Sequence, residues 1–430
     1  MAGGFTHASI ENLLVKVHDF AEVFGCRDLA IIKVKSLATA RGKRVLELLD
    51  RETVGYFSEG PFSLFGGTVY GLNWLTEYLL PFDMLIVDEA SQMKPGELAL
   101  GMKMLGEGGR LVLAGGDNLQ LSPIIKAAYS PPDDGTPGLD DSVFAYVRGR
   151  DDPIDPDFTY QLQENWRMNL TLSSFAAGTL YGNAYRPATE EICNQALVLG
   201  GEKTVKGEVD AFLEWLLDPD YPPLTLCIIE NVKAALANER EAELVAKLAT
   251  ELRERMQDPK RGSRYPDSEE GDDRFWREGL FIVSPHHLQI EAIQNHLARQ
   301  RTWRAHPPFV DTVDKMQGQE ANAVIVSYGV SDVETAITEA EFIYSLNRLN
   351  VSVTRARSKC IVFLSRPLLE PPIELLQQEK AAAGLHYMLE LQRFCRENGD
   401  TRTFAIHPDG DEHPVRVTVL RANVGGDGSE

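Results

Sequence analysis

The sequence predicts an α/β protein whose strands form parallel sheets. Six short apolar runs recur along the chain, at 84–87, 111–114, 226–229, 280–283, 323–326 and 360–364. Unbroken apolar strands of this length are typical of strands that are buried on both faces, as in parallel sheets covered by helices. Helix-like stretches lie between the runs, and this alternation indicates crossover units of strand, helix and strand.

The clearest helix is predicted from about Asn238 to Met256. Asn238 can cap the first turn, because its side chain can accept a hydrogen bond from a backbone N–H that the helix leaves unpaired. The apolar side chains recur at helical spacing and form one stripe, as expected of a helix that packs on a sheet. This stripe consists of Leu244, Val245, Leu248, Leu252 and Met256.

The chain is long for one domain, since 430 residues correspond to two or three domains of ordinary size. The segment 130–157 is rich in Asp, Pro and Gly and lacks periodicity, which makes it the best candidate for a linker. We therefore expect a first domain at 1–146 with a short insertion at about 20–62, a second domain at 147–370 with an acidic surface insertion at about 257–278, and a C-terminal extension at 371–430 with a disordered tail.

Composition excludes several classes of protein. No apolar run approaches the roughly 18 residues that cross a bilayer, and the first residues lack a signal sequence, so we expect a cytoplasmic protein without a membrane partner. The five cysteines are widely spaced, which favours reduced, buried thiols over a disulfide framework or a zinc site. The nine histidines do not form a set at metal-ligand spacing.

The net charge of −21 argues against attraction of nucleic acid over the whole surface. Much of the acidic excess is local, however, and lies in the segments 130–157 and 257–278 and in the tail. Such runs are usually solvated loops, so the net charge does not exclude a basic groove elsewhere on the protein.

Two carboxylates follow the first of the six apolar runs, in the stretch FDMLIVDEASQ at 82–92. In an open α/β sheet, ligands bind outside the carboxyl ends of the strands, where Asp88 and Glu89 are expected. One carboxylate can hold Mg²⁺ while its neighbour orients an attacking water, as phosphoryl transfer requires. Taken alone, the pair is more often a solvated acidic turn after a core strand.

Polar residues also follow or precede the later strands. Asp117 and Gln120 come after the second apolar run, and an uncharged Gln there could sense a terminal phosphate by hydrogen bonding. Arginines of a second domain could stabilise charge that develops on a transferred phosphoryl group. Each arginine alone is more often a surface residue. The candidate site residues of the second domain are Arg167, a Gln-Gly-Gln-Glu turn from Gln317 to Glu320, and Arg355 and Arg357 before the last strand.

These stretches occur in a fixed order from about Thr6 to Leu364: THASIENLL, GGTVYGL, VDEASQ, GGDNLQLSP, LQENWRMN, SPHHLQ, TVDKMQGQE and NRLNVSVTRAR. The series resembles the ordered motifs of superfamily 1 helicases. It is most similar to the 5′-to-3′ branch, which holds the nonsense-mediated mRNA decay helicase and the replication helicase-nuclease. The resemblance implies two RecA-like domains, ATP and Mg²⁺ as cofactors, and single-stranded DNA or RNA as the partner.

The resemblance also implies roles for individual residues. Asp88 would hold Mg²⁺, Glu89 would be the base for water, and Gln120 would contact the γ-phosphate. Arg167 and Arg355 would clamp that phosphate, with Glu320 near the ribose. Other residues of the nucleotide site would be Asp117, Gln317, Gly318 and Arg357, and the sugar-phosphate backbone of a strand would be bound by Thr6, Thr68, Ser284, Pro285 and Thr312.

One part of the family pattern is missing. The chain contains no Gly-x-x-x-x-Gly-Lys-Ser/Thr phosphate loop, which in the family precedes the THASIENLL motif. We therefore expect the C-terminal part of a longer ATP-dependent helicase or translocase, inactive as an isolated chain and with a missing N-terminal domain. The alternatives are a naturally shortened nucleic-acid-binding or regulatory module without hydrolysis, or one half of a split ATPase.

Overall fold

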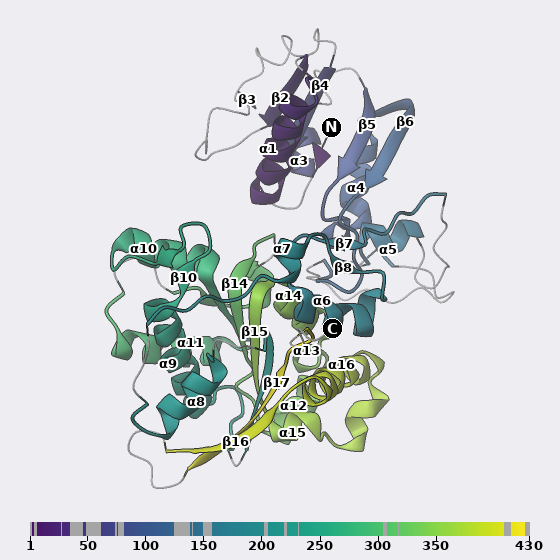
Figure 1. Ribbon diagram of the computed structural model, residues 1–430. Helices are drawn as coiled ribbons and strands as arrows, with labels where there is room; N and C mark the ends of the chain where they lie inside the picture. Colours follow the sequence, from purple (N-terminus) through teal and green to yellow (C-terminus); the bar gives the residue numbers. More distant parts are fainter. Residues whose placement is uncertain are drawn as a thin grey trace. The chain divides into compact units, whose positions relative to one another are not determined.

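The computed structural model describes most of the chain and divides it into two compact units, Met1–Tyr160 and Gln161–Glu430 (Figure 1). The unit boundary lies fourteen residues after the domain boundary expected at 146. The described residues are 2–3, 7–26, 28–34, 46–48, 62–73, 75, 81–123, 138–139, 141–148, 157–201, 205–218, 222–230, 232–303, 308–316, 318–407 and 414–425.

The first unit contains a six-stranded sheet in the order β3-β2-β4-β1-β5-β6. Every pairing between its strands is parallel, and the runs at 84–87 and 111–114 lie in the adjacent strands β5 and β6. The parallel α/β prediction is therefore confirmed here. The strands are β1 (Ala2–Gly3), β2 (Leu29–Val34), β3 (Leu46–Leu48), β4 (Phe62–Gly67), β5 (Phe82–Val87) and β6 (Leu105–Leu113).

Helices cover both faces of this sheet, because alternate residues of its strands face opposite sides. Ile31 packs with Ile10 and Leu14 of α1, whereas the next residue, Ile32, packs in a second cluster with Leu72 of α3. The helices are α1 (His7–Val23), α3 (Val69–Asn73), the short 3₁₀ helix η2 (Ala90–Gln92), α4 (Pro95–Met102) and α5 (Val143–Arg148).

The segment 20–62 differs from the insertion expected there. It supplies the end of α1 and the strands β2 and β3, and β2 pairs along its length with β4. The reason is that LAIIKV at 29–34 is itself an apolar strand, broken by one lysine. Lys33 is 4% exposed and tolerates burial because its ammonium donates to Glu11 at 2.8 Å.

The second unit contains a seven-stranded sheet in the order β13-β12-β14-β15-β9-β17-β16. The four remaining apolar runs lie in β9, β12, β14 and β15, which pair in parallel, while β17 runs antiparallel to β9. The strands are β9 (Leu224–Glu230), β12 (Leu280–Val283), β13 (Val310–Asp311), β14 (Ala321–Ser327), β15 (Ala356–Ser365), β16 (Thr401–Ile406) and β17 (Val415–Ala422), and two short ladders pair β7 (Glu164–Asn165) with β8 (Arg186–Pro187) and β10 (Gln257–Asp258) with β11 (Ser263–Arg264).

Helices also cover both faces of the second sheet, with α8, α9 and α11 on one side and α6, α14 and α16 on the other (Figure 1). The α-helices are α6 (Leu170–Ala176), α7 (Glu190–Cys193), α8 (Glu208–Leu216), α9 (Glu239–Arg255), α10 (Glu269–Arg274), α11 (His287–Gln300), α12 (Val333–Thr338), α13 (Ala340–Ile343), α14 (Leu346–Thr354), α15 (Arg366–Leu369) and α16 (Glu379–Glu397). Shorter helical turns are η3 (Ala177–Tyr181), η4 (Phe275–Gly279), η5 (Val313–Met316) and η6 (Ile373–Gln377).

Helix α9 forms where the sequence predicts it. Asn238 is the N-cap, and its side chain accepts a hydrogen bond from the Glu241 N–H at 3.2 Å. The predicted stripe is buried against the sheet, and Met256 ends the helix as the C-cap.

The acidic segment 257–278 was expected on the surface, but the structure folds it into β10, β11, α10 and most of η4. Phe275 and Trp276 are buried in the core of the unit. Asp272 is fully buried because Arg253, which is 2% exposed, forms an ion pair with it at 2.7 Å. Burial of both partners together removes the large cost of burying one charge alone.

The described part of the segment 371–430 is an integral part of the second unit. Val417 and Val419 of β17 belong to its core, and β17 extends the central sheet beyond β9. Helix α16 packs so closely that a Cβ on Gly384 would lie 1.5 Å from the carbonyl oxygen of Tyr344. The residues 426–430, for which we expect a disordered tail, lie outside the described residues.

Within the described ranges, no helix is both long enough and apolar enough to cross a membrane.

Candidate nucleotide and nucleic-acid site

The acidic pair lies at the carboxyl end of β5, as the sequence predicts. Asp88 follows the last residue of the strand and accepts a hydrogen bond from the Glu89 N–H on its Oδ1 atom, at 3.0 Å. Burial raises the pKa of Asp88, while this hydrogen bond and the charge of Lys16 act in the opposite direction. A partly buried carboxylate at the end of a strand can serve as an oxygen ligand of a divalent cation.

Glu89 adopts a left-handed backbone conformation, with φ 54° and ψ 46°. Among the described residues it is the only non-glycine residue with a positive φ. Such a conformation costs a residue with a Cβ about 1 to 2 kcal/mol, and backbone strain of this kind clusters at functional sites. The carboxylate Oε2 accepts a hydrogen bond from the Gln92 side chain at 2.8 Å, which fixes its direction.

Glycine is required opposite the acidic pair. Gly115 follows β6 with φ +60°, and a Cβ there would lie 3.1 Å from the Glu89 nitrogen and 3.3 Å from the Oδ1 atom of Asp88. The absence of a side chain therefore leaves space beside the two carboxylates, which fits their proposed use as the Mg²⁺ and water site.

Asp117 and Gln120 form a compact turn after β6. The Gln120 side chain donates to Oδ2 of Asp117 at 2.9 Å, and the Leu119 N–H donates to Oδ1 at 2.9 Å. Since β5 and β6 are neighbouring parallel strands, this turn and the acidic pair leave the same edge of the sheet. The first unit thus brings together Asp88, Glu89, Asp117 and Gln120.

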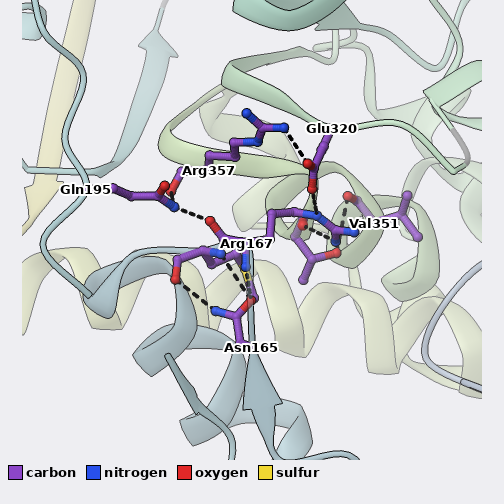
Figure 2. Close-up of polar contacts among 8 residues, drawn as sticks. Asn165, Arg167, Gln195, Glu320, Val351 and Arg357 are labelled. Atoms are coloured by element: carbon purple, nitrogen blue, oxygen red, sulfur yellow. Dashed lines mark hydrogen bonds and ion pairs between the residues drawn. The ribbon is translucent and has the colours of Figure 1, made fainter. Parts of the chain in front are cut away.

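In the second unit, two arginines converge on one glutamate (Figure 2). The Nε atom of Arg167 donates to Oε2 of Glu320 at 2.7 Å, and the Arg357 guanidinium forms an ion pair with Oε1. Arg167 also donates to the carbonyl oxygen of Thr354 at 3.0 Å. The cluster carries two positive charges and one negative charge, and about a third of each side chain is exposed.

The two arginines determine the charge state of Glu320. Burial alone would raise the pKa of its carboxyl, but the hydrogen bonds and charges of Arg167 and Arg357 together outweigh burial and hold the pKa below its ordinary value. Glu320 is therefore ionised at neutral pH and occupies the place that an anionic ligand of the two arginines would take.

Arg355 lies close in sequence but in a different environment. It is the C-cap of α14 and is 4% exposed, and its backbone carbonyl accepts from Ala321 at 3.1 Å. Glu320 accepts from both Arg167 and Arg357, so these three side chains form one cluster.

Three carboxamides that the sequence analysis did not single out hold the arginine segments. Asn165 Oδ1 accepts from the backbone N–H groups of Arg167 and Met168, both at 3.0 Å. Gln195 donates to the backbone carbonyls of Arg167 and Arg357, and Asn169 caps α6. Asn165 and Asn169 lie within the motif LQENWRMN. Gln195 lies outside every motif, so no sequence pattern marks it as a functional residue.

The predicted strand-binding residues lie in both units. Thr68 caps α3 by accepting from the Gly71 N–H at 3.1 Å. Ser284 and Pro285 follow β12 and line a shallow pocket with Arg348 and Phe342, and Thr312 follows β13. Gly318 has φ +72°, which suits the turn before β14. Thr6 and Gln317 lie outside the described residues.

Known helicases are similar to this chain in sequence. The chain is 26% identical over 387 residues to the DNA replication ATP-dependent helicase/nuclease DNA2 of Xenopus laevis, a match that covers 85% of this chain and 33% of that protein. The protein of the same name from Homo sapiens is 26% identical over 398 residues, covering 86% and 33%. The chain thus spans about one third of the length of these curated relatives.

Among solved structures, the helicase nonstructural protein 10 of an arterivirus in complex with DNA aligns with a TM-score of 0.38 and 13% identity, over 84% of this chain and 53% of that chain. The family model AAA_12, described as an AAA domain, matches residues 139–366, which is just over half of the chain. The chain therefore belongs to the AAA domain family, in its superfamily 1 helicase type, and is homologous to the DNA2 helicase/nuclease.

Proposed function

We propose that this chain forms the two RecA-like motor units of an ATP-dependent helicase or translocase that moves on single-stranded nucleic acid. The observation that carries the proposal is the grouping of Asp88 and Glu89 with Asp117 and Gln120 at one edge of a parallel sheet. Strand ends of this kind are where α/β proteins bind nucleotides. Similarity to ATP-dependent helicases supports the same assignment.

In the first unit, Asp88 is proposed to hold Mg²⁺, which would neutralise charge on the phosphates of ATP when bound. Glu89 accepts a proton from the attacking water, and its strained backbone and the Gln92 hydrogen bond fix the direction of the carboxylate. Gln120 donates a hydrogen bond to the γ-phosphate through the second N–H of its carboxamide, while the first donates to Asp117.

In the second unit, Arg167 and Arg355 are proposed to stabilise the charge that develops on the transferred phosphoryl group. Arg357, Gln317 and Gly318 complete the nucleotide-binding residues, and Glu320 is proposed to bind the ribose.

We propose that the phosphate loop is supplied by sequence outside these 430 residues, since none of its variants occurs within them. The DNA upstream of the Met1 codon tests this directly. An in-frame Gly-Lys-Ser/Thr loop within about a hundred codons supports the proposal, and an in-frame stop codon contradicts it.

Single-stranded DNA is the first substrate to test, because the names of the relatives refer to DNA replication. Thr68, Ser284, Pro285 and Thr312 are proposed to bind the sugar-phosphate backbone through hydroxyls and backbone amides, which does not require a basic surface. An RNA strand of the same sequence is the comparison, because only contacts to the 2′-hydroxyl would separate the two.

The decisive experiment measures ATP hydrolysis with and without a single strand, for this chain and for the longer product of its reading frame. We expect strand-stimulated hydrolysis in the longer product only, with a loss of at least about a hundredfold in Glu89→Gln. Glu107→Gln, at an exposed position on β6, is the matched control. Hydrolysis that survives Glu89→Gln contradicts the proposed role of the acidic pair.

The second unit is tested by separating turnover from strand binding. In the longer product, Arg355→Ala should lower turnover far more than strand affinity, while the exposed control Arg396→Ala should change neither. Loss of strand affinity with normal turnover would instead assign Arg355 to the nucleic acid.

A further inference from the structure

We propose that Gln195 is a positioning residue that fixes the backbones of Arg167 and Arg357 so that both guanidinium groups converge on one anion. The inference rests on the proposed function, in which that anion is a phosphate of the nucleotide. Gln195 lies in the turn after α7, outside all of the motifs that the sequence analysis identified.

The side chain of Gln195 joins two segments that are far apart in the sequence. Its Nε2 atom donates to the carbonyl oxygen of Arg357 at 2.9 Å and forms a short contact with the carbonyl oxygen of Arg167 (Figure 2). A carboxamide nitrogen carries two N–H groups and can serve both carbonyls at once. One side chain therefore sets the spacing between the two arginine backbones.

Asn169 reinforces this junction from the other side. Its backbone N–H donates to the Arg357 carbonyl at 3.1 Å, and its carboxamide donates to the Ser358 carbonyl at 2.9 Å and the Gln195 carbonyl at 3.1 Å. Asn169 thus ties the Arg357 segment to Gln195, and the side chain of Gln195 bridges the backbones of Arg167 and Arg357.

Such a bridge is needed because the two guanidinium groups repel each other. Glu320 offsets this repulsion here by accepting from Arg167 on one oxygen and from Arg357 on the other. A phosphate offers the same arrangement of anionic oxygens, and the rigid fork of arginine suits it. Held at the backbone by Gln195, both arginines stay directed at one place whichever anion occupies it.

A purely structural role for Gln195 leads to a different expectation. If its amide only satisfies two carbonyl groups, its loss should lower the stability of the unit without changing how the arginines act on an anion. Thr189→Ala provides that comparison, because Thr189 caps α7 by accepting from the Ile192 N–H at 3.3 Å and loosens the same segment without touching the arginines.

The test measures, by calorimetry, the affinity of the full 430-residue chain for inorganic triphosphate. We expect Gln195→Ala to weaken triphosphate binding by about tenfold, the loss that follows when one charge-assisted hydrogen bond is misaligned. Thr189→Ala should bind triphosphate like the wild type. Equal affinity in wild type and Gln195→Ala, with both chains folded, overturns the proposal.

A second measurement does not depend on a ligand. In chain labelled with ¹³C at the glutamate carboxyl, the Glu320 signal is assigned by its absence in Glu320→Gln. We expect the pKa of Glu320 to rise toward its ordinary value in Gln195→Ala and to stay low in Thr189→Ala. An unchanged Glu320 titration in Gln195→Ala overturns the positioning role. If the wild-type chain, which lacks the phosphate loop, binds no triphosphate, the Glu320 titration decides the role of Gln195, and hydrolysis by the longer product decides the proposed function separately.

Discussion

Replacing Glu241 with glutamine should remove a large pH dependence from the stability of the second unit. Glu241 is fully buried in the first turn of α9, where its Oε1 atom accepts from Ser327 at 2.6 Å and from the Gly329 N–H at 3.0 Å. Its Oε2 atom is buried without a hydrogen-bond partner among the described residues. Burial raises the pKa of this carboxyl from 4.5 to about 7, against the effect of those hydrogen bonds.

The sign of the effect follows from where the proton is bound. Between pH 4.5 and about 7 the folded protein keeps the proton on Glu241, whereas the unfolded chain has lost it. The contribution to stability is thus fully present below pH 4.5 and is lost as the pH rises to about 7. At about 1.4 kcal/mol for each pH unit, the interval amounts to about 3 kcal/mol.

The assay is unfolding in urea at pH 5 and pH 8, followed by tryptophan fluorescence, because Trp276 is buried in the same core. A glutamine resembles the protonated carboxyl, so the free energy of unfolding of Glu241→Gln should not share the loss that wild type suffers at high pH. The free energy of unfolding of Glu241→Gln minus that of wild type should therefore be about 2 to 3 kcal/mol larger at pH 8 than at pH 5. Glu254→Gln, at an exposed position of α9, is the control. If the difference between Glu241→Gln and wild type is the same at both pH values, the reasoning is refuted.

Three further substitutions test the packing and the backbone. Arg253→Ala should destabilise the second unit by about 3 kcal/mol in urea unfolding, because it removes the 2.7 Å partner of the buried Asp272 carboxylate and leaves Arg301 at 3.6 Å, whereas Arg261→Ala in an exposed pair should cost at most about 1 kcal/mol. Glu89→Gly should be more stable than Glu89→Ala by about 1 kcal/mol, since only glycine adopts the left-handed conformation without strain; the opposite order in thermal unfolding contradicts this. Gly384→Ala should lower stability by about 3 kcal/mol or more because its Cβ would overlap a carbonyl, while Gly178→Ala, which faces open space, should melt near the wild type.

The sheets and α9 could be predicted because their signal is local. An apolar run such as 323–326 is buried on both faces whatever its neighbours, and Asn238 caps the helix that directly follows it. The acidic pair was predictable for a similar reason, since the carboxylates follow their strand without a gap.

Other features depend on partners that are distant in the sequence. The sequence alone predicts a surface position for Asp272, because its ion-pair partner Arg253 lies in a different helix. Likewise, the alternating residues of β17 do not reveal that β9 is their neighbour. Gln195 carries no motif signal, because its role comes from two backbone carbonyls that any residue type would supply.

The antiparallel strand β17 also has a consequence for how the chain folds as it is synthesised. Strand β9 at 224–230 lies between β15 and β17, and β17 is made of residues 415–422. One side of β9 therefore stays unpaired until almost the whole chain has been translated. Since chains fold from the N-terminus during synthesis and exposed apolar edges favour aggregation, we expect the nascent second unit to need protection by chaperones until β17 emerges.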